Sequence, residues 1–259
     1  MKYRWWLITS LVVLLLMVWQ SNRDTGVKVV FCDVGQGDGA LIIKGGFQML
    51  IDVGGGNQKM LQCLSRHLPF WDKTIETVVI SHWDTDHSGG LPGIYRYYKI
   101  EKLYSNQLPP ENSEQKFYPT KVSENDVIRF GEIDFEILNK VVEGGDSNEN
   151  SLIGVLSYKD KKILMMGDAP FEADQILVWQ GKFKTFSSGV DILKISHHGS
   201  DRATSPELLD EVKPTMAIIS VGKDNKFGHP AKVVIKRLEE RGIKINRTDN
   251  MGDVTVMYE

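Results

Sequence analysis

The sequence has very few cysteines and no excess of basic charge. Its 259 residues include only Cys32 and Cys63, which excludes a disulfide framework or a cluster of zinc-binding thiolates. A single bridge between the two is allowed but not favoured, because Cys32 lies in an apolar run where a small buried side chain is expected. The formal net charge is -3, so no basic field covers the whole chain. Any anion must therefore be bound locally.

The chain also lacks a linker rich in proline, glycine or serine, so residues 25–259 are expected to form one domain. Residues 1–24 are expected to be a signal peptide or membrane anchor. Lys2 and Arg4 precede an uncharged stretch, residues 5–22, which has neither a polar stripe nor a small-x-small cleavage site after it. We favour an uncleaved hydrophobic helix that anchors the chain at the extracellular face of the cell membrane, with secretion as the alternative.

Short runs rich in β-branched residues alternate with segments of helical spacing. The predicted strands are 27–33, 40–44, 47–53, 75–80, 101–105, 126–130, 133–139, 152–158, 161–166, 191–196, 216–221, 243–247 and 253–257. The predicted helices are 57–68, 89–98, 171–179, 205–212 and 230–241. This order predicts an α/β fold in which two mixed sheets pack face to face with helices outside. Segments 107–125 and 143–150 are predicted as surface loops.

Four potential metal ligands lie within six residues of one loop. The run SHWDTDHSGG, residues 81–90, directly follows a predicted strand and contains His82, Asp84, Asp86 and His87. Alternate side chains on such a loop can converge on one point, while the two glycines let the backbone turn sharply into a helix. A solvated turn is the alternative, but two imidazoles and two carboxylates packed this closely favour a metal site.

The spacing of these four residues resembles the HxHxDH signature of the metallo-β-lactamase superfamily, with aspartate in place of the second histidine. The other matching motifs are DVGQGD (33–38), LIDVGG (50–55), GD (167–168), SHHGS (196–200), FGHP (227–230) and RTD (247–249). Together they resemble the extracellular hydrolase domain of ComEC-type competence proteins over about residues 27–257. The channel portion of those proteins has no counterpart here, so the resemblance implies the hydrolase alone and not DNA transport.

The resemblance implies a metallo-β-lactamase-like αββα sandwich with a dinuclear metal site at one sheet edge. The metal ligands assigned on this basis are His82, Asp84, Asp86, His87, Asp168 and His197. The first metal would be held by His82 and Asp84, the second by Asp86 and His87, and Asp168 would bridge them, although Asp168 could also cap a helix. We assign His198 to catalysis, but the sequence leaves open which histidine of the 197–198 pair is the ligand.

One histidine that many relatives carry is absent, because no histidine lies between His87 and His197. The segment 147–152 resembles the ComEC-type sequence and suggests Asn150 as a weak oxygen ligand, with a surface turn as an equal alternative. Oxygen ligands in place of imidazole favour harder ions. We therefore expect two divalent metal ions, with Mn²⁺ favoured and Zn²⁺ or Mg²⁺ as alternatives.

Such a metal pair can activate water and neutralise charge on a phosphoryl oxygen, and Asp86 could orient the water. His229 precedes a proline at a helix start, so it is a candidate for binding the phosphate or protonating the leaving oxygen. A structural role for His229 is equally open. Asp33 and Asp38 could support the site from behind, although turn chemistry is their favoured role.

Basic residues concentrate in the second half of the chain. Residues 182–247 hold 13 Lys plus Arg against 8 Asp plus Glu, whereas residues 25–181 hold 15 against 22. Lys226 and Ser200 join His229 as candidate substrate-binding residues. The resemblance therefore predicts an extracellular metal-dependent phosphodiesterase, a nuclease that cleaves single-stranded DNA. The alternatives are a hydrolase of a small phosphodiester, choline-phosphate or lactone, and a non-catalytic module that binds anions or a partner. The oligomeric state is not predicted.

Overall fold

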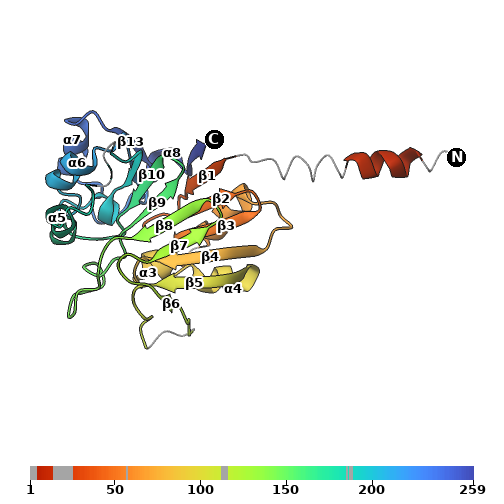
Figure 1. Ribbon diagram of the computed structural model, residues 1–259, viewed down its shortest axis with the longest axis horizontal. Coiled ribbons are helices and arrows are strands. Elements are labelled where there is room, and N and C mark those ends of the chain that lie inside the picture. The colour runs from red at the N-terminus through yellow and green to blue at the C-terminus, as the bar shows by residue number, and fades with distance from the viewer. Residues whose placement is uncertain (1–4, 14–25, 57, 112–115, 185, 187–188) are drawn as a thin grey trace.

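A computed structural model describes residues 5–13, 26–56, 58–111, 116–184, 186 and 189–259. Two sheets of seven strands each pack face to face, and helices cover their outer faces (Figure 1). The predicted α/β sandwich of two mixed sheets with flanking helices is therefore confirmed.

The first sheet has the order β14-β1-β2-β3-β4-β5-β6. Its strands are β1 (Val27–Phe31), β2 (Gly39–Lys44), β3 (Phe47–Val53), β4 (Thr74–Ile80), β5 (Lys99–Ser105), β6 (Thr120–Lys121) and β14 (Val254–Tyr258). Pairing is antiparallel from β14 to β3 and parallel from β3 to β6. The sheet is therefore mixed, and its parallel strands end at a common edge.

The second sheet repeats this pattern with the order β13-β12-β11-β10-β9-β8-β7. Its strands are β7 (Val127–Phe130), β8 (Ile133–Ile137), β9 (Gly154–Tyr158), β10 (Lys161–Met165), β11 (Ile192–Lys194), β12 (Met216–Ile219) and β13 (Lys244–Arg247). Pairing is antiparallel from β7 to β10 and parallel from β10 to β13. Each sheet thus has one antiparallel and one parallel section.

Apolar side chains fill three layers of this sandwich. One cluster lies between the sheets and includes Phe31, Ile51, Phe135 and Leu156. Two further clusters lie under the outer helices, one beneath each sheet. The helices are α2 (Lys59–His67), α3 (Thr85–Ser88), α4 (Leu91–Tyr97), α5 (Phe171–Trp179), α6 (Pro206–Val212), α7 (Lys232–Glu239) and α8 (Thr248–Met251), with a 3-10 helix η1 (Ser196–Gly199). Burial of apolar surface on both faces of each sheet is the main force that holds the layers together.

Each predicted strand and each predicted helix is present, with ends that shift by at most two residues. The two-residue strand β6 lies inside the segment 107–125 that was predicted as a loop. The short helices α3, α8 and η1 were not predicted either. Elements of two to four residues carry too few side chains to show a periodic pattern, which explains these differences.

The bridge that the sequence did not favour is present. Cys32 follows β1 and Cys63 lies on α2, and a disulfide joins them across 31 residues with a Cα–Cα distance of 5.9 Å. Both cysteines are fully buried in the cluster beneath the first sheet. The apolar surroundings of Cys32 were therefore predicted correctly, but they indicated only burial and not which residue would lie opposite.

The predicted N-terminal segment falls mostly outside the described residues. Of the stretch 5–22, the structure describes 5–13, which is helical. The boundary expected between residues 24 and 25 also lies outside the described part. None of the helices in the described ranges is long and apolar enough to cross a membrane.

An unusual buried carboxyl, Asp174, lies on α5. Its Oδ2 accepts a hydrogen bond of 2.8 Å from the Ser205 backbone N–H, while its Oδ1 has no partner among the described residues. Burial raises the pKa of Asp174 to about 6, against the weaker opposing effect of the Ser205 hydrogen bonds. The ionised carboxylate is therefore poorly tolerated in the folded protein.

We expect an Asp174→Asn variant to change how stability depends on pH. Between about pH 4 and pH 6 the folded wild-type protein keeps a proton that the unfolded chain loses, so the free energy of unfolding falls as pH rises. Above about pH 6 the accumulated loss is on the order of 3 kcal/mol, whereas both forms are protonated at lower pH and lose nothing. Asn keeps the acceptor for Ser205 and does not ionise, so it should be the more stable side chain near pH 8.

Urea unfolding of metal-free wild type and Asp174→Asn at about pH 4, 6 and 8 measures this difference. Glu239→Gln, an exposed change on α7, is the control and should follow the wild type. The same pH slope in Asp174→Asn and wild type would contradict the prediction.

Candidate metal centre

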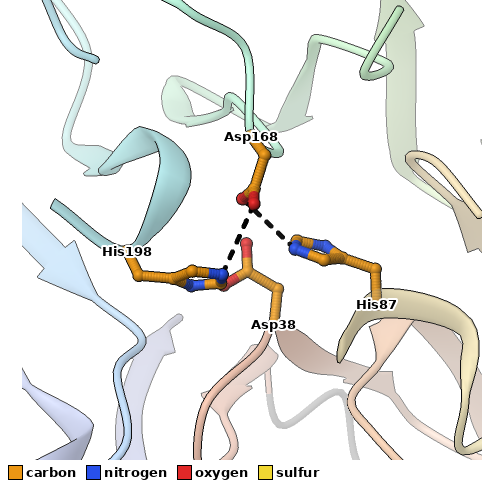
Figure 2. A group of neighbouring side chains, drawn as sticks. All are labelled: Asp38, His87, Asp168 and His198. Atoms are coloured by element: carbon orange, nitrogen blue, oxygen red, sulfur yellow. Dashed lines mark ion pairs between the residues drawn. The ribbon is translucent and has the colours of Figure 1, made fainter. Parts of the chain in front are cut away.

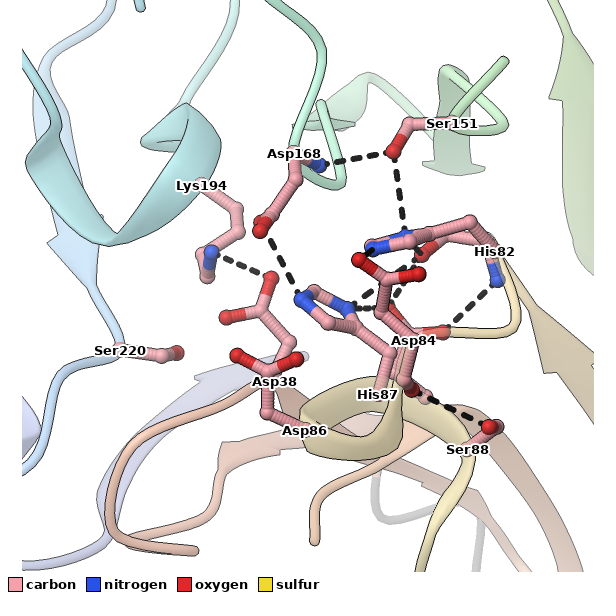
Figure 3. A network of polar contacts seen from close by, with 12 residues as sticks. Asp38, His82, Asp84, Asp86, His87, Ser88, Ser151, Asp168, Lys194 and Ser220 are labelled. Carbon is pink, nitrogen blue, oxygen red and sulfur yellow. Dashed lines mark hydrogen bonds and ion pairs between the residues drawn. The ribbon is translucent and has the colours of Figure 1, made fainter. Parts of the chain in front are cut away.

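Loops that follow strands of both sheets meet at one edge of the sandwich (Figure 3). The residues that they bring together are His82, Asp84, Asp86 and His87 after β4, Asp168 after β10, and His197 and His198 after β11. Since β4 belongs to the first sheet and β10 and β11 to the second, the site lies between the two halves of the chain. The clustering that the sequence motifs predicted is therefore seen in the fold.

His87 is held by the carboxylate of Asp52, at the end of β3. The His87 Nδ1 lies 2.9 Å from Asp52 Oδ2, and its Nε2 lies 3.2 Å from Asp168 Oδ1. Asp52 is itself fixed by the Ser81 backbone N–H and by the Ser81 hydroxyl, both at 2.7 Å. A carboxylate behind one ring nitrogen orients the other toward the centre, as in many histidines that bind metals.

His82 lies beside His87, with 4.1 Å between the ring centroids. Its Nδ1 faces the hydroxyls of Ser81 at 3.0 Å and Ser151 at 3.1 Å. Its Nε2 is buried, has no hydrogen-bond partner, and lies 3.7 Å from Asp84 Oδ2. The two serines therefore occupy one ring nitrogen and leave the other directed at the carboxylates.

Asp168 occupies the middle of the cluster (Figure 2). Its Oδ1 faces His87, while its Oδ2 lies 3.4 Å from His198 Nε2 and 3.7 Å from His197 Nε2. Its backbone N–H donates to the Ser151 hydroxyl at 3.0 Å, which fixes the start of the loop after β10. The carboxylate thus faces imidazoles from both sheets, as expected of a group that bridges two ions.

His198 is held from behind by a second set of contacts. Its Nδ1 lies 3.0 Å from the Ser220 carbonyl oxygen and 3.3 Å from Asp38 Oδ1. Its Nε2 lies 3.3 Å from Asp86 Oδ2. Asp38 forms a buried ion pair of 2.6 Å with Lys194 Nζ, which also donates to the Ile195 carbonyl oxygen at 2.9 Å (Figure 3).

Asp38 therefore faces the site, whereas turn chemistry was its favoured role. Burial by itself would raise the pKa of Asp38, but Lys194 and the nearby histidines outweigh it and lower the pKa to about 2. The preceding Gly37 has φ +130°, and a Cβ there would lie 2.1 Å from the Asp86 carbonyl oxygen. Only glycine lets the turn approach the ligand loop this closely. Asp33, in contrast, accepts from the Gly35 N–H at 3.0 Å, which is turn chemistry as favoured.

Three residues of the cluster have left-handed backbone conformations. Asp52, His197 and His198 have φ values of 56°, 46° and 54°. Such values are uncommon for residues other than glycine and are concentrated at functional sites, where surrounding contacts hold them. The backbone at His197 and His198 is therefore not that of a strand, in which neighbouring side chains point to opposite faces.

The donor set fits divalent metal ions. Four atoms of the cluster are buried and make no hydrogen bond in the described part of the chain: Asp38 Oδ1, His82 Nε2, His87 Nε2 and Asp168 Oδ1. Potential ligand atoms of Asp38, His87, Asp168 and His198 all lie within 4.8 Å of one another. His87 Nε2 and Asp168 Oδ1 face each other as an ion pair and Asp38 Oδ1 faces His198 Nδ1, so these atoms converge as paired acids and imidazoles, the groups that bind a divalent cation once the imidazole protons leave. Imidazole suits zinc and iron, whereas carboxylate suits manganese and magnesium.

The charges of the cluster are strongly coupled. Burial alone would lower the pKa values of His87 and His198, but Asp168 and the neighbouring carboxylates outweigh it and raise both well above the usual range. Burial alone would raise the pKa of Asp168, but His87 and His198 outweigh it and hold this pKa well below the usual range. In the metal-free protein, protons on the imidazoles therefore balance the carboxylates, and metal binding must release them.

His197 and His229 lie toward solvent from this cluster. The His197 side chain is 35% exposed, and its ring centroid lies 5.8 Å from that of His229 in an edge-on arrangement. Burial and the charges of His197 and His198 lower the pKa of His229. Asn225 fixes His229 by accepting from its N–H at 3.0 Å and donating to its carbonyl oxygen at 2.6 Å.

Three residues that the sequence predicted for the site, Asn150 as a ligand and Ser200 and Lys226 as substrate-binding residues, form no hydrogen bond or ion pair with the metal-binding side chains in the described part of the chain. The Asn150 amide is occupied within its own loop, where it donates to the carbonyl oxygens of Val142 and Gly145 and accepts from the Val142 N–H. Ser200 is nearly buried below His197 and bonds to the local backbone. Lys226 is exposed on the loop between β12 and α7. The serine beside Asn150, Ser151, is the residue that contacts His82.

The functional residues that sequence reasoning missed are Asp52, Ser81, Ser151, Lys194 and Ser220. Two of these residues could have been found from the sequence. Asp52 follows a run of apolar residues in the LIDVGG motif, and Lys194 interrupts the apolar strand β11. A charged side chain inside a buried strand requires a charged partner, so Lys194 predicts a buried acid nearby.

The fold and this cluster are those of the metallo-beta-lactamase superfamily. A family model for that superfamily matches residues 32–223, so the chain belongs to it. Members of the superfamily are generally metal-dependent hydrolases.

Within the superfamily, the chain resembles competence proteins. It is 31% identical over 250 residues to Recombination protein 2 of Haemophilus influenzae, which covers 94% of this chain and 30% of that protein. ComE operon protein 3 of Bacillus subtilis is 25% identical, over 97% of this chain and 35% of its own length. Competence protein ComA of Neisseria gonorrhoeae is 28% identical, over 93% and 34%. The predicted ComEC-type resemblance is confirmed, and the chain spans about a third of the length of these relatives.

Solved structures show the same fold at low sequence identity. The metallo-beta-lactamase fold protein YhfI from Bacillus subtilis has a TM-score of 0.61 at 11% identity, over 90% of this chain and 100% of that one. CmlA, a diiron beta-hydroxylase from Streptomyces venezuelae, has a TM-score of 0.57 at 14% identity, over 90% and 54%. These similarities support the αββα architecture and leave the reaction to be argued from the site.

Proposed function

We propose that this chain is a phosphodiesterase that uses two divalent metal ions to cleave single-stranded DNA. The observation that carries the proposal is the convergence of His87 and His198 on Asp168, with His82 beside His87 and its Nε2 buried without a hydrogen-bond partner. Orienting groups stand behind all three imidazoles. This arrangement is costly unless a cation completes it, because unpaired buried donors destabilise a fold.

We propose that His82 and Asp84 hold one ion, that Asp86, His87 and His198 hold the other, and that Asp168 lies between them. His198 replaces His197 as the ligand because its Nε2 faces both Asp86 and Asp168 and its Nδ1 is held from behind. The carboxylates in this set favour manganese over zinc. When bound, paired ions activate water and neutralise charge that develops on the phosphoryl oxygens.

The remaining groups would act on the substrate. Asp86 is partly exposed beside His198 and can accept a proton from the attacking water. His197 and His229 face the solvent side of the cluster, where a phosphodiester would approach. His229 can donate a hydrogen bond to the phosphodiester or the leaving oxygen, and burial together with the charges of His197 and His198 lowers its pKa, which favours the neutral imidazole near neutral pH.

Two observations support DNA as the substrate, and a third supports the outside of the cell as the location. Three relatives that match more than nine tenths of this chain are named as a recombination protein, a ComE operon protein and a competence protein, and residues 182–247, which carry His198 and His229, hold an excess of basic residues. The disulfide between Cys32 and Cys63 suits an oxidising compartment. We propose that residues 1–24 direct the chain there and tether it to the membrane.

The test is a panel of substrates with purified protein loaded with Mn²⁺, Zn²⁺ or Mg²⁺. We expect cleavage of a labelled single-stranded DNA oligonucleotide, fastest with Mn²⁺, and a loss of at least about a hundredfold in Asp86→Ala. Asp134→Asn, at a half-exposed carboxylate on β8 that pairs with Arg129, is the control. Hydrolysis of small chromogenic esters or lactones without oligonucleotide cleavage would contradict the DNA proposal. Strict activation by zinc would contradict the choice of metal.

A further inference from the structure

An aromatic ring is exposed beside the proposed catalytic groups. Phe227 lies on the loop between β12 and α7, and 68% of its surface is exposed. Its ring stacks on His229 at a centroid distance of 5.8 Å and an interplanar angle of 27°. His229 in turn lies 5.8 Å from His197, whose Nε2 is 3.7 Å from Asp168 Oδ2. Three rings therefore lead from the proposed metal centre out to solvent.

The loop is built to hold this ring outward. Asn225 accepts hydrogen bonds from the N–H groups of Phe227 at 3.2 Å and His229 at 3.0 Å. It also donates to the carbonyl oxygens of Gly222 at 3.1 Å and His229 at 2.6 Å. One side chain thus fixes the loop at both ends. The outward face of Phe227 is part of a fixed surface.

The aromatic residue in the first ligand loop is different. Trp83 stacks on Phe117 at 6.0 Å, Phe117 stacks on Tyr95 at 5.5 Å, and Trp83 donates its indole N–H to the Gln107 carbonyl oxygen. Trp83 and Phe117 also pack against the core beneath the first sheet. This stack has internal partners on several sides. Phe227, in contrast, contacts only His229 among the ring pairs of the described residues.

We propose that Phe227, backed by His229, forms a stacking subsite for a nucleobase that adjoins the scissile phosphodiester of a single-stranded nucleic acid. The inference rests on the proposed function and adds to it that the substrate must carry a nucleobase next to the cleaved phosphodiester. Aromatic rings beside a positively charged backbone track are how proteins bind single strands without reading their sequence. Lys223 and Lys226 are exposed on the same loop and supply positive charge for the flanking phosphates. A single-stranded base has a free face that a duplex would hide.

The experiment compares a thymidine oligonucleotide with an abasic oligonucleotide of the same length, so that only the bases differ. For the Mn²⁺-loaded wild-type chain we expect kcat/KM to favour the thymidine substrate by about 5- to 100-fold, the range expected for one base stacked on an aromatic ring. In Phe227→Ala this ratio should fall to near one, and Phe227→Trp should restore it. Trp179→Ala, a ring 86% exposed at the end of α5, is the matched control and should keep the wild-type ratio.

A binding measurement separates this inference from the proposed function. An oligonucleotide that carries 2-aminopurine should lose fluorescence on the metal-free wild-type protein, because stacking quenches this base, and Phe227→Ala should remove most of the quenching. If the wild-type protein cleaves neither substrate, the proposed function fails and this measurement decides the subsite by itself. An unchanged substrate ratio in Phe227→Ala, or no quenching by the wild type, would overturn the stacking subsite.

Discussion

An Asp168→Asn variant is expected to lose bound divalent metal and, with it, hydrolysis of phosphodiesters. Asp168 is buried and lies within 3.7 Å of ring nitrogens of His87, His197 and His198. The amide of Asn lacks the charge that attracts the ions, and its NH2 group would face the histidines. Groups that merely orient ligands change affinity or activity by about 10- to 100-fold, so loss of a direct ligand shared by two ions should exceed that.

Metal content after gel filtration measures this prediction independently of any substrate. We expect about two equivalents of Mn²⁺ in the wild-type protein and less than about one in Asp168→Asn. Asp160→Asn, at an exposed turn between β9 and β10, is the control. If Asp168→Asn retained both ions, Asp168 would be a structural cap and not a bridging ligand.

The second large effect is expected from Lys194→Met, which breaks the buried ion pair with Asp38. The change removes the lysine from the buried Asp38 carboxylate, which still faces His198 Nδ1 at 3.3 Å, and breaking a buried pair costs about 3–5 kcal/mol of the free energy of unfolding. The double variant Asp38→Asn with Lys194→Met removes both charges and should recover most of this loss. It also removes the carboxylate beside His198 Nδ1, so its metal affinity should fall by about 10- to 100-fold even though it folds.

Urea unfolding of the metal-free single and double variants, followed by a metal titration of the double variant, measures both effects. Arg241→Met is the comparison, because Arg241 pairs with the exposed Asp210 at 2.7 Å and such a surface pair contributes less than about 1 kcal/mol. If the double variant were as unstable as Lys194→Met, the cost would lie in lost packing and not in the unpaired charge.

How far the sequence predicts this protein depends on whether a feature is local. The strands could be predicted because each consists of an alternating or continuous apolar run of consecutive residues. The loop from His82 to His87 was recognisable because its four potential ligands are close together in the sequence. Asp52 could not be assigned from its own surroundings. Its role comes from a contact with His87, which lies 35 residues away in the sequence.

The same limit explains the residues whose positions differed from expectation. Asn150 is one residue from Ser151, which contacts His82, but its amide closes its own loop. His197 and His198 adopt left-handed backbone conformations, so neighbouring positions no longer alternate as on a strand. For Cys32 and Cys63, a sequence separation of 31 gives no information about their distance in the fold. Each of these features is decided by long-range packing.

The division of the ligands between the two sheets ties the occupancy of the centre to the integrity of the whole molecule. His82 and His87 follow a strand of the first sheet, and Asp168 and His198 follow strands of the second. A cation bound by both sets would therefore link the two sheets. Metal binding and folding would then be coupled, so that a low concentration of the ion would lower both the activity and the free energy of unfolding. A chain of this design would last longest where its cation is plentiful.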